Sequence, residues 1–414
     1  TGLVADIIPG PESGLQSWTQ TIAVGDSVYF TARDTTSSYG ESLWVSDGTA
    51  AGTRQLTPDG VDVFLGEGLA PLGSDVLFVA YDDTNGTSLW KTDGTVAGTS
   101  WVVTTGPTYN LTALGGEAVF QRYSGDYGYE LWKTDGTAAG TVLVKDIHAG
   151  SSGSSPYGFA IVGSEIFFSA DDGVSGTELW KSDGTEAGTV MVKDINTAVS
   201  GGGFAYGSHP SDLTVVGDTL FFTANDGASG RELWKSDGTS SGTVLVRNIA
   251  AEISTPGTFL PGPYYPGIPD PENPGSYLPG SGFYGPGTYV PGDEIPQGSY
   301  PRSLVASSGL LFFIADDGDF GEQVWVSDGT DSGTVAVSSL PGGASGGGSA
   351  SYAILPALAG TILFPADSGV FFQTSDGDLW SADGTIGGTA VVKEFPDAEP
   401  VPGSGSYASM AMLN

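Results

Sequence analysis

Acidic and amide side chains stand in pairs beside glycine at several points of this sequence, in a pattern that could bind a hard cation. The pairs are Asp82-Asp83, Asp171-Asp172, Asn225-Asp226 and Asp316-Asp317-Gly318-Asp319. Calcium requires several oxygen ligands around one centre, which paired carboxylates and nearby carbonyls can supply. We therefore hypothesise Ca²⁺ binding at Asp171, Asp172, Asp226, Asp316, Asp317 and Asp319. The alternative is a series of solvated acidic turns, since no copy has the full spacing of an EF-hand.

A second group of candidate residues is aromatic. Residues 255–301 hold twelve of the 25 prolines of the chain and seven Pro-Gly dipeptides. Tyrosines held between prolines offer stacking area at low entropic cost, which suits contact with sugar rings or with another protein. The candidate binding residues are Tyr264, Tyr265, Tyr277, Tyr284 and Tyr289. A spacer without a binding role is the alternative interpretation.

Residues for catalysis are scarce. The chain has no cysteine and only two histidines, His148 and His209, and it has no glycine motif that would cradle a phosphate. A carboxylate pair of the kind that cleaves glycosides cannot be singled out among 48 acidic residues. The sequence therefore predicts a protein that is not an enzyme and requires no cofactor.

The charge balance limits the partners. With 48 acidic and 13 basic residues, the formal net charge is -35, and such a surface repels nucleic acid and anionic lipid. No apolar run reaches the roughly 18 residues of a membrane span. The chain opens on Thr1-Gly2-Leu3 without a methionine, which predicts a mature form whose targeting segment has been removed. Asn85 and Asn110 match the N-glycosylation pattern, and glycosylation is a minor hypothesis.

A repeat must position these residues. One pattern recurs seven times, each copy with a tryptophan, at Trp44, Trp90, Trp132, Trp180, Trp234, Trp325 and Trp380. Each copy contains four short apolar stretches separated by Gly and Asp turns, which predict four strands, named A to D. Residues 166–195 show strands B to D most clearly. Seven such units predict an all-β fold, a seven-bladed β-propeller of four-stranded antiparallel blades formed by residues 1–414 as a single domain.

The Asp-Gly-Thr turn between strands C and D, as at Asp183-Gly184-Thr185, invites a calcium interpretation too. The structural interpretation is favoured, because Asp and Thr side chains satisfy backbone groups in tight turns and Gly takes positive φ.

Two segments depart from the repeat. Residues 255–301 lie between blades 5 and 6, and their proline content predicts an inserted loop of polyproline II and tight turns rather than a degenerate eighth blade. Residues 1–7 match strand D and residues 406–413 resemble strand A. Seven complete blades leave these two terminal strands over, so at least one could add to an edge or to another subunit.

The block from Glu178 to Thr189, Glu-Leu-Trp-Lys-Ser-Asp-Gly-Thr-Glu-Ala-Gly-Thr, resembles the bacterial repeat family named for its ELWxxDGTxxGT pattern. The resemblance covers essentially the whole chain apart from the insertion. Copies six and seven depart at Gln323-Val324-Trp325 and Asp378-Leu379-Trp380 but keep Asp-Gly-Thr. The resemblance to this family implies a secreted protein or one exposed on the bacterial cell surface.

In a propeller the B-to-C and D-to-A connections emerge on one face, so the acidic turns and the insertion should share it. Two functions follow. The first is a non-enzymatic extracellular structural subunit of a surface layer, matrix or filament, which self-associates through terminal strand exchange. The second is an adhesive propeller that binds glycans or other surface proteins through the acidic, tyrosine-bearing face.

Overall fold

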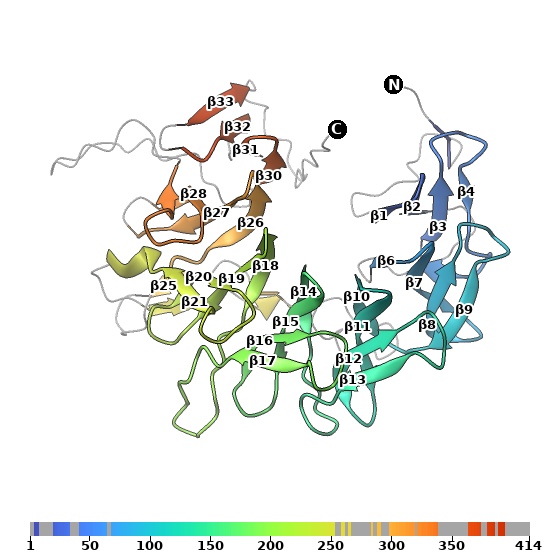
Figure 1. Ribbon diagram of the computed structural model, residues 1–414, viewed down its shortest axis with the longest axis horizontal. Helices are drawn as coiled ribbons and strands as arrows, with labels where there is room; N and C mark the ends of the chain where they lie inside the picture. Colours follow the sequence, from blue (N-terminus) through green and yellow to red (C-terminus); the bar gives the residue numbers. More distant parts are fainter. Residues whose placement is uncertain are drawn as a thin grey trace. The chain divides into compact units, whose positions relative to one another are not determined.

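The protein is described here by a computed structural model, which covers residues 4–7, 20–33, 41–63, 68–252, 258–260, 264–265, 283–284, 288–290, 298–318, 321–337, 363–373, 379–385 and 388–393. Its strands form seven successive antiparallel sheets, each of which is called a blade (Figure 1). No helix among these residues has the length and apolar character that crossing a membrane demands.

The first four blades have the following strands. Blade 1 contains β1 (Thr21–Val24), β2 (Ser27–Ala32), β3 (Ser42–Ser46) and β4 (Arg54–Gln55). Blade 2 contains β5 (Asp62–Val63), β6 (Leu69–Leu72), β7 (Asp75–Asp82), β8 (Gly86–Thr92) and β9 (Ser100–Thr104). Blade 3 contains β10 (Thr108–Leu114), β11 (Glu117–Ser124), β12 (Gly128–Thr134) and β13 (Val142–Lys145). Blade 4 contains β14 (Tyr157–Val162), β15 (Glu165–Asp171), β16 (Thr177–Ser182) and β17 (Val190–Lys193).

The remaining strands form three blades and two small sheets. Blade 5 contains β18 (Ser211–Val216), β19 (Thr219–Asn225), β20 (Arg231–Ser236) and β21 (Val244–Arg247), followed by a 3₁₀ turn, η1 (Ile249–Glu252). Blade 6 contains β26 (Arg302–Ser307), β27 (Leu310–Asp316), β28 (Glu322–Ser327) and β29 (Val335–Ala336). Blade 7 contains β30 (Phe364–Ala366), β31 (Gly369–Gln373), β32 (Leu379–Ala382) and β33 (Thr389–Lys393).

The predicted fold class, an all-β protein of the seven-bladed β-propeller type, is confirmed. Six of the seven sheets are four-stranded meanders in sequence order. In blade 2, β5 and β6 both pair with β7, so strand A is present as two short pieces. The chain divides into two compact units, Thr1–Val174 with Trp180–Met191 and Ser175–Leu179 with Val192–Asn414.

Aromatic pairs join the middle strands of each blade. A phenylalanine of strand B lies opposite the repeat tryptophan of strand C, as in Phe222 and Trp234. Where the rings stack, as in Phe30 with Trp44 and Phe78 with Trp90, their centroids lie 6.5 and 6.3 Å apart. Such pairs place a wide apolar surface on the sheet, and each buried ring contributes roughly 1.5 to 3 kcal/mol.

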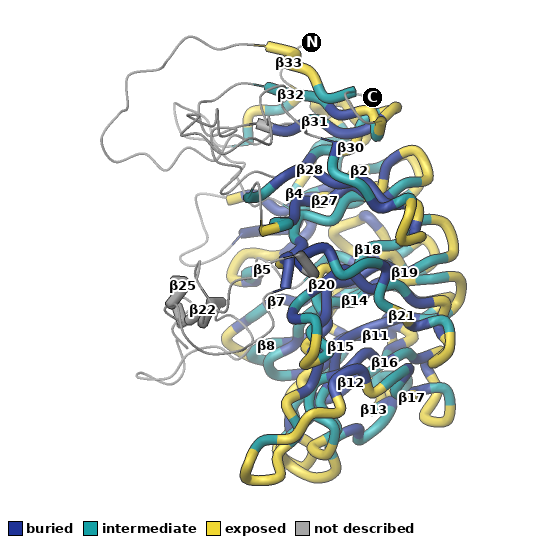
Figure 2. The backbone as a smooth tube through the Cα atoms, turned by 90° about the vertical axis from the view of Figure 1, so that its left-hand side faces the viewer, coloured by how far each residue is buried: buried dark blue, intermediate teal, exposed yellow. Residues whose placement is uncertain are grey.

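Consecutive blades bury these surfaces against each other. One core cluster joins Leu131 and Val144 of blade 3 to Phe168 and Trp180. Comparable clusters join blades 1 and 2, blades 2 and 3, blades 5 and 6, and blades 6 and 7. Figure 2 shows the outcome, with buried stretches along the strands and exposed residues at the turns.

Basic side chains of strand D strengthen the same boundaries. Lys145 Nζ donates to the carbonyl of Thr189, at 2.7 Å, and lies 6.0 Å from the ring centroid of Trp180. Lys193 repeats this contact with Thr243 and Trp234, and Arg247 repeats it with Thr334 and Trp325. A cation over an indole ring adds electrostatic attraction to the hydrogen bond. Several of the 13 basic residues thus serve blade packing.

The insertion differs from the prediction. We expected a loop of polyproline II and turns over residues 255–301, but β22 (Thr258–Leu260) pairs with β25 (Thr288–Val290), and β23 (Tyr264–Tyr265) pairs with β24 (Phe283–Tyr284). These short strands lie between the prolines and consist mainly of β-favouring residues, so proline removes no donor from either ladder.

The surplus terminal strands stay predictions. Residues 4–7 are described and carry no strand, whereas residues 1–3 and 406–413 lie outside the described residues. Strand exchange through the termini is therefore untested.

We predict that Trp234→Ala lowers the free energy of unfolding by about 3 to 5 kcal/mol, because it leaves a cavity beside Phe222. Trp234 is 6% exposed, whereas Trp101 is 44% exposed and serves as the control. Trp101→Ala should change the value by no more than about 0.5 kcal/mol. Denaturant titrations of both variants provide the measurement, and equal effects would contradict the assignment of Trp234 to the core.

Candidate functional site

The connections from strand B to strand C and from strand D to strand A lie at the same end of each blade, and we call this set of connections the loop face. It consists of the B-to-C turns 83–85, 125–127, 172–176, 226–230 and 317–318, the D-to-A connections 105–107, 146–156, 194–210 and 298–301, and the strand residues that adjoin them. Its position follows from the meander, because each strand C begins where strand D ends.

A buried glutamate fixes the loop face to the sheets. Glu178, at the start of β16, is fully buried. Its Oε1 accepts hydrogen bonds from the backbone N–H groups of Asn196 and Ser208, at 3.2 and 2.8 Å. Its Oε2 accepts from the N–H of Ile195, at 3.0 Å, and from Ser208 Oγ, at 2.5 Å. One carboxylate therefore holds both ends of the D-to-A connection that follows blade 4.

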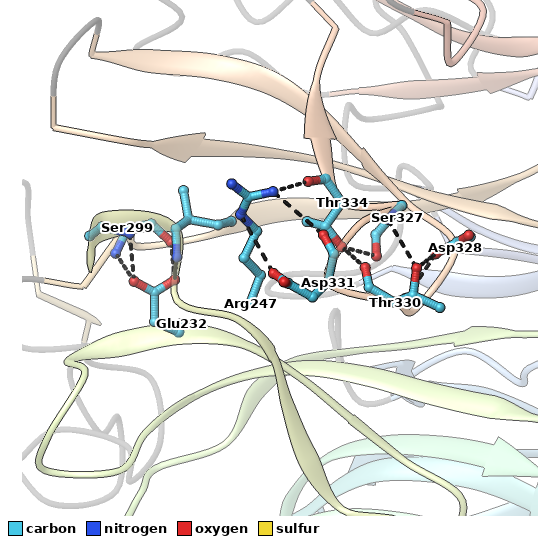
Figure 3. Close-up of polar contacts among 11 residues, drawn as sticks. Glu232, Arg247, Ser299, Ser327, Asp328, Thr330, Asp331 and Thr334 are labelled. Atoms are coloured by element: carbon cyan, nitrogen blue, oxygen red, sulfur yellow. Dashed lines mark hydrogen bonds and ion pairs between the residues drawn. The ribbon is translucent and has the colours of Figure 1, made fainter. Parts of the chain in front are cut away.

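The same arrangement recurs in two other blades. Glu130 accepts hydrogen bonds from His148 N and from the N–H and hydroxyl of Ser154. Glu232 accepts from Ile249, Ala250 and Ser299, as Figure 3 shows for Ser299. Burial raises the pKa of Glu130, Glu178 and Glu232, and the hydrogen bonds from serine and backbone partly oppose that shift.

A Gly-Ser-X-Pro motif supplies the partner of each glutamate, and the interpretation of the sequence missed it. It occurs at 153–156, 207–210 and 298–301. The serine is buried against the carboxylate, whereas the third residue has positive φ, 49° at Ser155 and 48° at His209 and Tyr300, and is exposed. A Cβ on Gly153 would collide with the backbone nitrogen of Tyr129, so glycine is required there. Aligning the seven copies residue by residue would have revealed this motif.

The Asp-Gly-Thr turns at the other end of the blades are structural devices. Asp183 Oδ1 accepts from the N–H and hydroxyl of Thr185, at 2.9 and 2.6 Å, and these bonds lower the pKa of Asp183. Thr185 Oγ1 accepts from Gly188 N, where a Cβ would overlap the carboxylate. The bond from the threonine N–H to the aspartate recurs in six further turns, including that of Asp328 and Thr330 in Figure 3.

The predicted calcium ligands cap their own turns. Asp171 accepts from Gly173 N at 2.7 Å, and Asp172 accepts from Val174 N at 2.8 Å. Asp226 and Asp316 accept from Ala228 N and Gly318 N, while Asp317 accepts from Gln323 Nε2. Among the described residues, no three His, Cys, Asp or Glu side chains are grouped so as to hold a metal. Asp319 lies outside the described residues. The hydrogen bonds within these turns favour the interpretation as acidic turns, and calcium binding stays a prediction.

The predicted binding tyrosines fall in the insertion. Tyr264 lies opposite Tyr284 in the β23–β24 pair, and Tyr289 lies opposite Phe259 in the β22–β25 pair. Tyr277 is outside the described residues. The pairing brings Tyr264 and Tyr284 together along the backbone, but a binding role stays a prediction.

The two glycosylation candidates lie in ordered positions. The amide nitrogen of Asn85 donates to both carboxylate oxygens of Asp82, at 3.2 and 2.9 Å. Asn110 lies within β10, at a bulge with φ of 59°. Modification of Asn85 would require its amide to leave Asp82.

Exposed aromatic side chains concentrate on the loop face. Seven aromatic residues in the described part of the chain are exposed, and one of them, Trp101 on β9, lies outside the loop face. The other six are Tyr123, Tyr127, Tyr157, Phe204, Tyr206 and Tyr300, all in or next to the connections defined above. The expectation from the sequence placed aromatic binding residues only in the insertion and therefore missed five of these six. Tyr300 lies within residues 255–301 but was not among the candidates.

One hairpin carries the most exposed of them. Ser200 N donates to the Phe204 carbonyl at 2.8 Å, Tyr206 N donates to Ala198 at 3.1 Å, and Gly203 N closes the turn onto Ser200. Phe204 is 77% exposed and Tyr206 is 57% exposed. An isolated β-bridge joins Val199 to Ala205, so Phe204 and Tyr206 lie on either side of the bridged residue in this hairpin.

The repeat also varies at the strand ends that border the loop face. Opposite positions on strands B and C hold Tyr123 and Tyr129 in blade 3, Asn225 and Arg231 in blade 5, and Asp316 and Glu322 in blade 6. The core phenylalanine, tryptophan and Asp-Gly-Thr turn persist in the same copies. Because the blade folds with such different side chains, these positions are free to serve binding.

The side chains at these variable strand ends differ in chemistry from blade to blade. In blade 6, Arg302 holds Glu322 through two hydrogen bonds of 2.9 Å. Burial, with the charges of Asp317 and Glu322, raises the pKa of Asp316, and the Gly318 N–H opposes that shift. In blade 5, Arg231 donates to Ser211 Oγ, Thr223 Oγ1 and the carbonyl of His209. The strand ends of blades 5 and 6 are therefore charged, whereas those of blade 3 are aromatic.

Comparisons with known proteins bear on the fold. No protein-family model matches the sequence, and no curated protein matches it. Among solved structures, the chain is similar to a puromycin hydrolase mutant complexed with PGG, at 13% identity and a TM-score of 0.45, over 94% of this chain and 55% of that one. It is also similar to the β-propeller domain of the Trilobed protease from Pyrococcus furiosus, at 9% identity and a TM-score of 0.39, over 92% and 100%. A computationally designed protein, Ika8, matches at 14% and 0.45, over 94% and 89%.

One sequence prediction is corrected by these matches. We expected a protein that is not an enzyme, but the similar structures include puromycin hydrolase and prolyl endopeptidases. The chain spans about half the length of these hydrolases, and likeness of this degree assigns no activity to it. The prediction relied on the absence of cysteine and the scarcity of histidine, and neither feature excludes chemistry by carboxylates in a chain with 48 acidic residues.

We predict that Glu178→Ala lowers the free energy of unfolding by about 3 kcal/mol or more, because it leaves the N–H groups of Ile195 and Ser208 buried without an acceptor. Glu186, exposed in the next turn, is the control, and Glu186→Ala should be neutral within about 0.5 kcal/mol. Denaturant unfolding measures both. A neutral Glu178→Ala would show that the carboxylate does not anchor the connection.

The raised pKa of Glu178 makes the free energy of unfolding depend on pH. A carboxyl whose pKa is higher in the folded state stabilises the fold most below its unfolded pKa, about 4.3, and this contribution is lost as pH rises through the folded pKa. The unfolding free energy of the wild type, measured relative to Glu178→Gln, should therefore fall as pH increases from 4 towards neutrality. A difference that stays constant or grows over this range would contradict the direction of the shift.

Proposed function

We propose that this protein is a secreted or cell-surface adhesive propeller that binds carbohydrate through its loop face. The observation that carries the proposal is the location of six of the seven exposed aromatic side chains of the described residues on that face. Exposing apolar rings to water is unfavourable, so their recurrence at the same end of the blades is typical of binding surfaces.

The chemistry of the face suits sugars. Aromatic rings offer flat apolar surface to the C–H groups of a pyranose, and tyrosine adds a hydroxyl for hydrogen bonding. The acidic turns accept hydrogen bonds from sugar hydroxyls. A net charge of -35 disfavours uronates and other anionic polymers, so the favoured ligands are neutral.

The location outside the cell is part of the proposal. It rests on the resemblance of the block at Glu178–Thr189 to the ELWxxDGTxxGT repeats of secreted and surface proteins. An adhesive protein must reach its glycans outside the cell, so location and binding function support each other.

Self-association is the second candidate function, and one observation favours it. Strand D is an edge strand of its blade, and its residues Val142, Val190 and Val244 are 36 to 40% exposed. An edge strand with exposed valines can pair with a strand of another molecule. Light scattering across a range of concentrations would reveal such association, and a monomer at every concentration would refute it.

The carbohydrate proposal predicts that Phe204→Ala combined with Tyr206→Ala weakens binding to immobilised neutral glycans by at least tenfold, because two stacking rings are removed. Glycan arrays with purified wild-type and variant proteins provide the measurement.

The matched control replaces Val142 and Val190 by alanine, since both are exposed on D strands outside the loop face. This control should bind like the wild type. Wild-type binding by the Phe204 and Tyr206 variant at every positive glycan would exclude the hairpin, and the absence of any positive glycan for the wild type would overturn the proposed function.

A further inference from the structure

Three tyrosines meet at the loop-face end of blade 3, one from each of its first three strands. Tyr109 lies on β10, Tyr123 on β11 and Tyr129 on β12. The ring centroids of Tyr123 and Tyr129 are 5.1 Å apart, and those of Tyr109 and Tyr129 are 6.0 Å apart, with interplanar angles of 54° and 46°. The three rings therefore pack as one tilted cluster rather than as separate side chains.

The blade fold does not require this cluster. The matching positions hold Ser211, Asn225 and Arg231 in blade 5, and they hold Arg302, Asp316 and Glu322 in blade 6. Both blades keep the same strand order and the same buried phenylalanine opposite tryptophan. The tyrosines of blade 3 are thus a local feature that blade packing leaves unexplained.

The cluster is both accessible and held in place. Tyr123 is 45% exposed, and Tyr127 is exposed in the adjoining turn. The carbonyl of Tyr129 accepts a hydrogen bond from Ser155 N at 2.9 Å, and Gly153 packs against its backbone nitrogen. The next residue is Glu130, whose buried carboxylate anchors the same connection. A ligand would meet rings whose backbone is already ordered.

The charge around the cluster limits the ligand. Arg122 lies on β11 next to Tyr123, but its guanidinium donates to the Thr105 carbonyl and lies 4.2 Å from the ring centroid of Trp132. Neighbouring residues of a strand point to opposite faces, so this cation is directed away from the tyrosines. The adjoining turn contributes Asp126, which is exposed. An anionic ligand would lack a positive partner here, whereas a hydroxyl-bearing neutral one would find acceptors.

We infer that Tyr109, Tyr123, Tyr127 and Tyr129 form a subsite for one pyranose ring of a neutral polysaccharide, with the sugar stacked on Tyr123. This inference rests on the proposed carbohydrate-binding function and assigns it to a particular place. The strands fix the position of the stacking ring, and the hydroxyls of Tyr123 and Tyr127 and the carboxylate of Asp126 offer hydrogen bonds to the substituents of the sugar ring.

Titration calorimetry with the full chain tests the subsite. The probes are cellohexaose, chitohexaose, mannohexaose and laminarihexaose as neutral oligosaccharides, with oligogalacturonate as the anionic comparator. The wild type should bind at least one neutral probe and should not bind the anionic one. Tyr123→Ala should weaken that binding at least tenfold, whereas Tyr123→Phe, which keeps the ring, should stay within about threefold of the wild type.

The control is Trp101→Ala, which removes an exposed aromatic ring outside the loop face and should leave affinity unchanged. Circular dichroism and thermal unfolding of each variant confirm folding. If Tyr123→Ala binds like the wild type while the Phe204 and Tyr206 variant loses binding, the subsite is wrong and the proposed function stands. If the wild type binds no neutral probe and no glycan on the array, both are wrong.

Discussion

The physical constraint on which this structure depends is that a four-stranded sheet with two apolar faces cannot bury both by itself. Each blade presents a phenylalanine opposite a tryptophan, and the described core clusters join such surfaces of consecutive blades. A single repeat therefore buries little apolar surface, whereas a series of repeats buries much more. The same constraint explains why strand D carries a basic residue, since Lys193 secures the boundary by contacting both the backbone and the indole of the next blade.

Carboxylates serve this scaffold in two opposite environments. Glu178 is buried, its pKa is raised by burial, and its four hydrogen bonds order the chain between blades. Asp183 is exposed in a turn, and its pKa is lowered by hydrogen bonds from Thr185. Both roles are local and structural. The net charge of -35 remains after all 13 basic residues are counted, which favours neutral ligands over anionic ones.

Function is separated from folding within each repeat. The residues that fold a blade recur from copy to copy, whereas the strand ends next to the loop face change from three tyrosines in blade 3 to an arginine held by a glutamate in blade 6. The anchoring glutamate lies one residue beyond these variable positions, as Glu130 follows Tyr129. A rigid anchor beside a variable side chain allows the surface to change without loss of the fold.

The sequence alone determined the blade count, the strand order and the structural role of the Asp-Gly-Thr turns, because strand periodicity and turn chemistry act over a few residues and recur seven times. It did not reveal the short strands of the insertion or the partners of the buried glutamates. Glu178 and Ser208 are 30 residues apart, and Glu232 and Ser299 are 67 apart, so only the tertiary structure brings them together. It also decided which aromatic rings are exposed, since Phe120 and Tyr123 lie on one strand but Phe120 is fully buried against the neighbouring sheet whereas Tyr123 is 45% exposed.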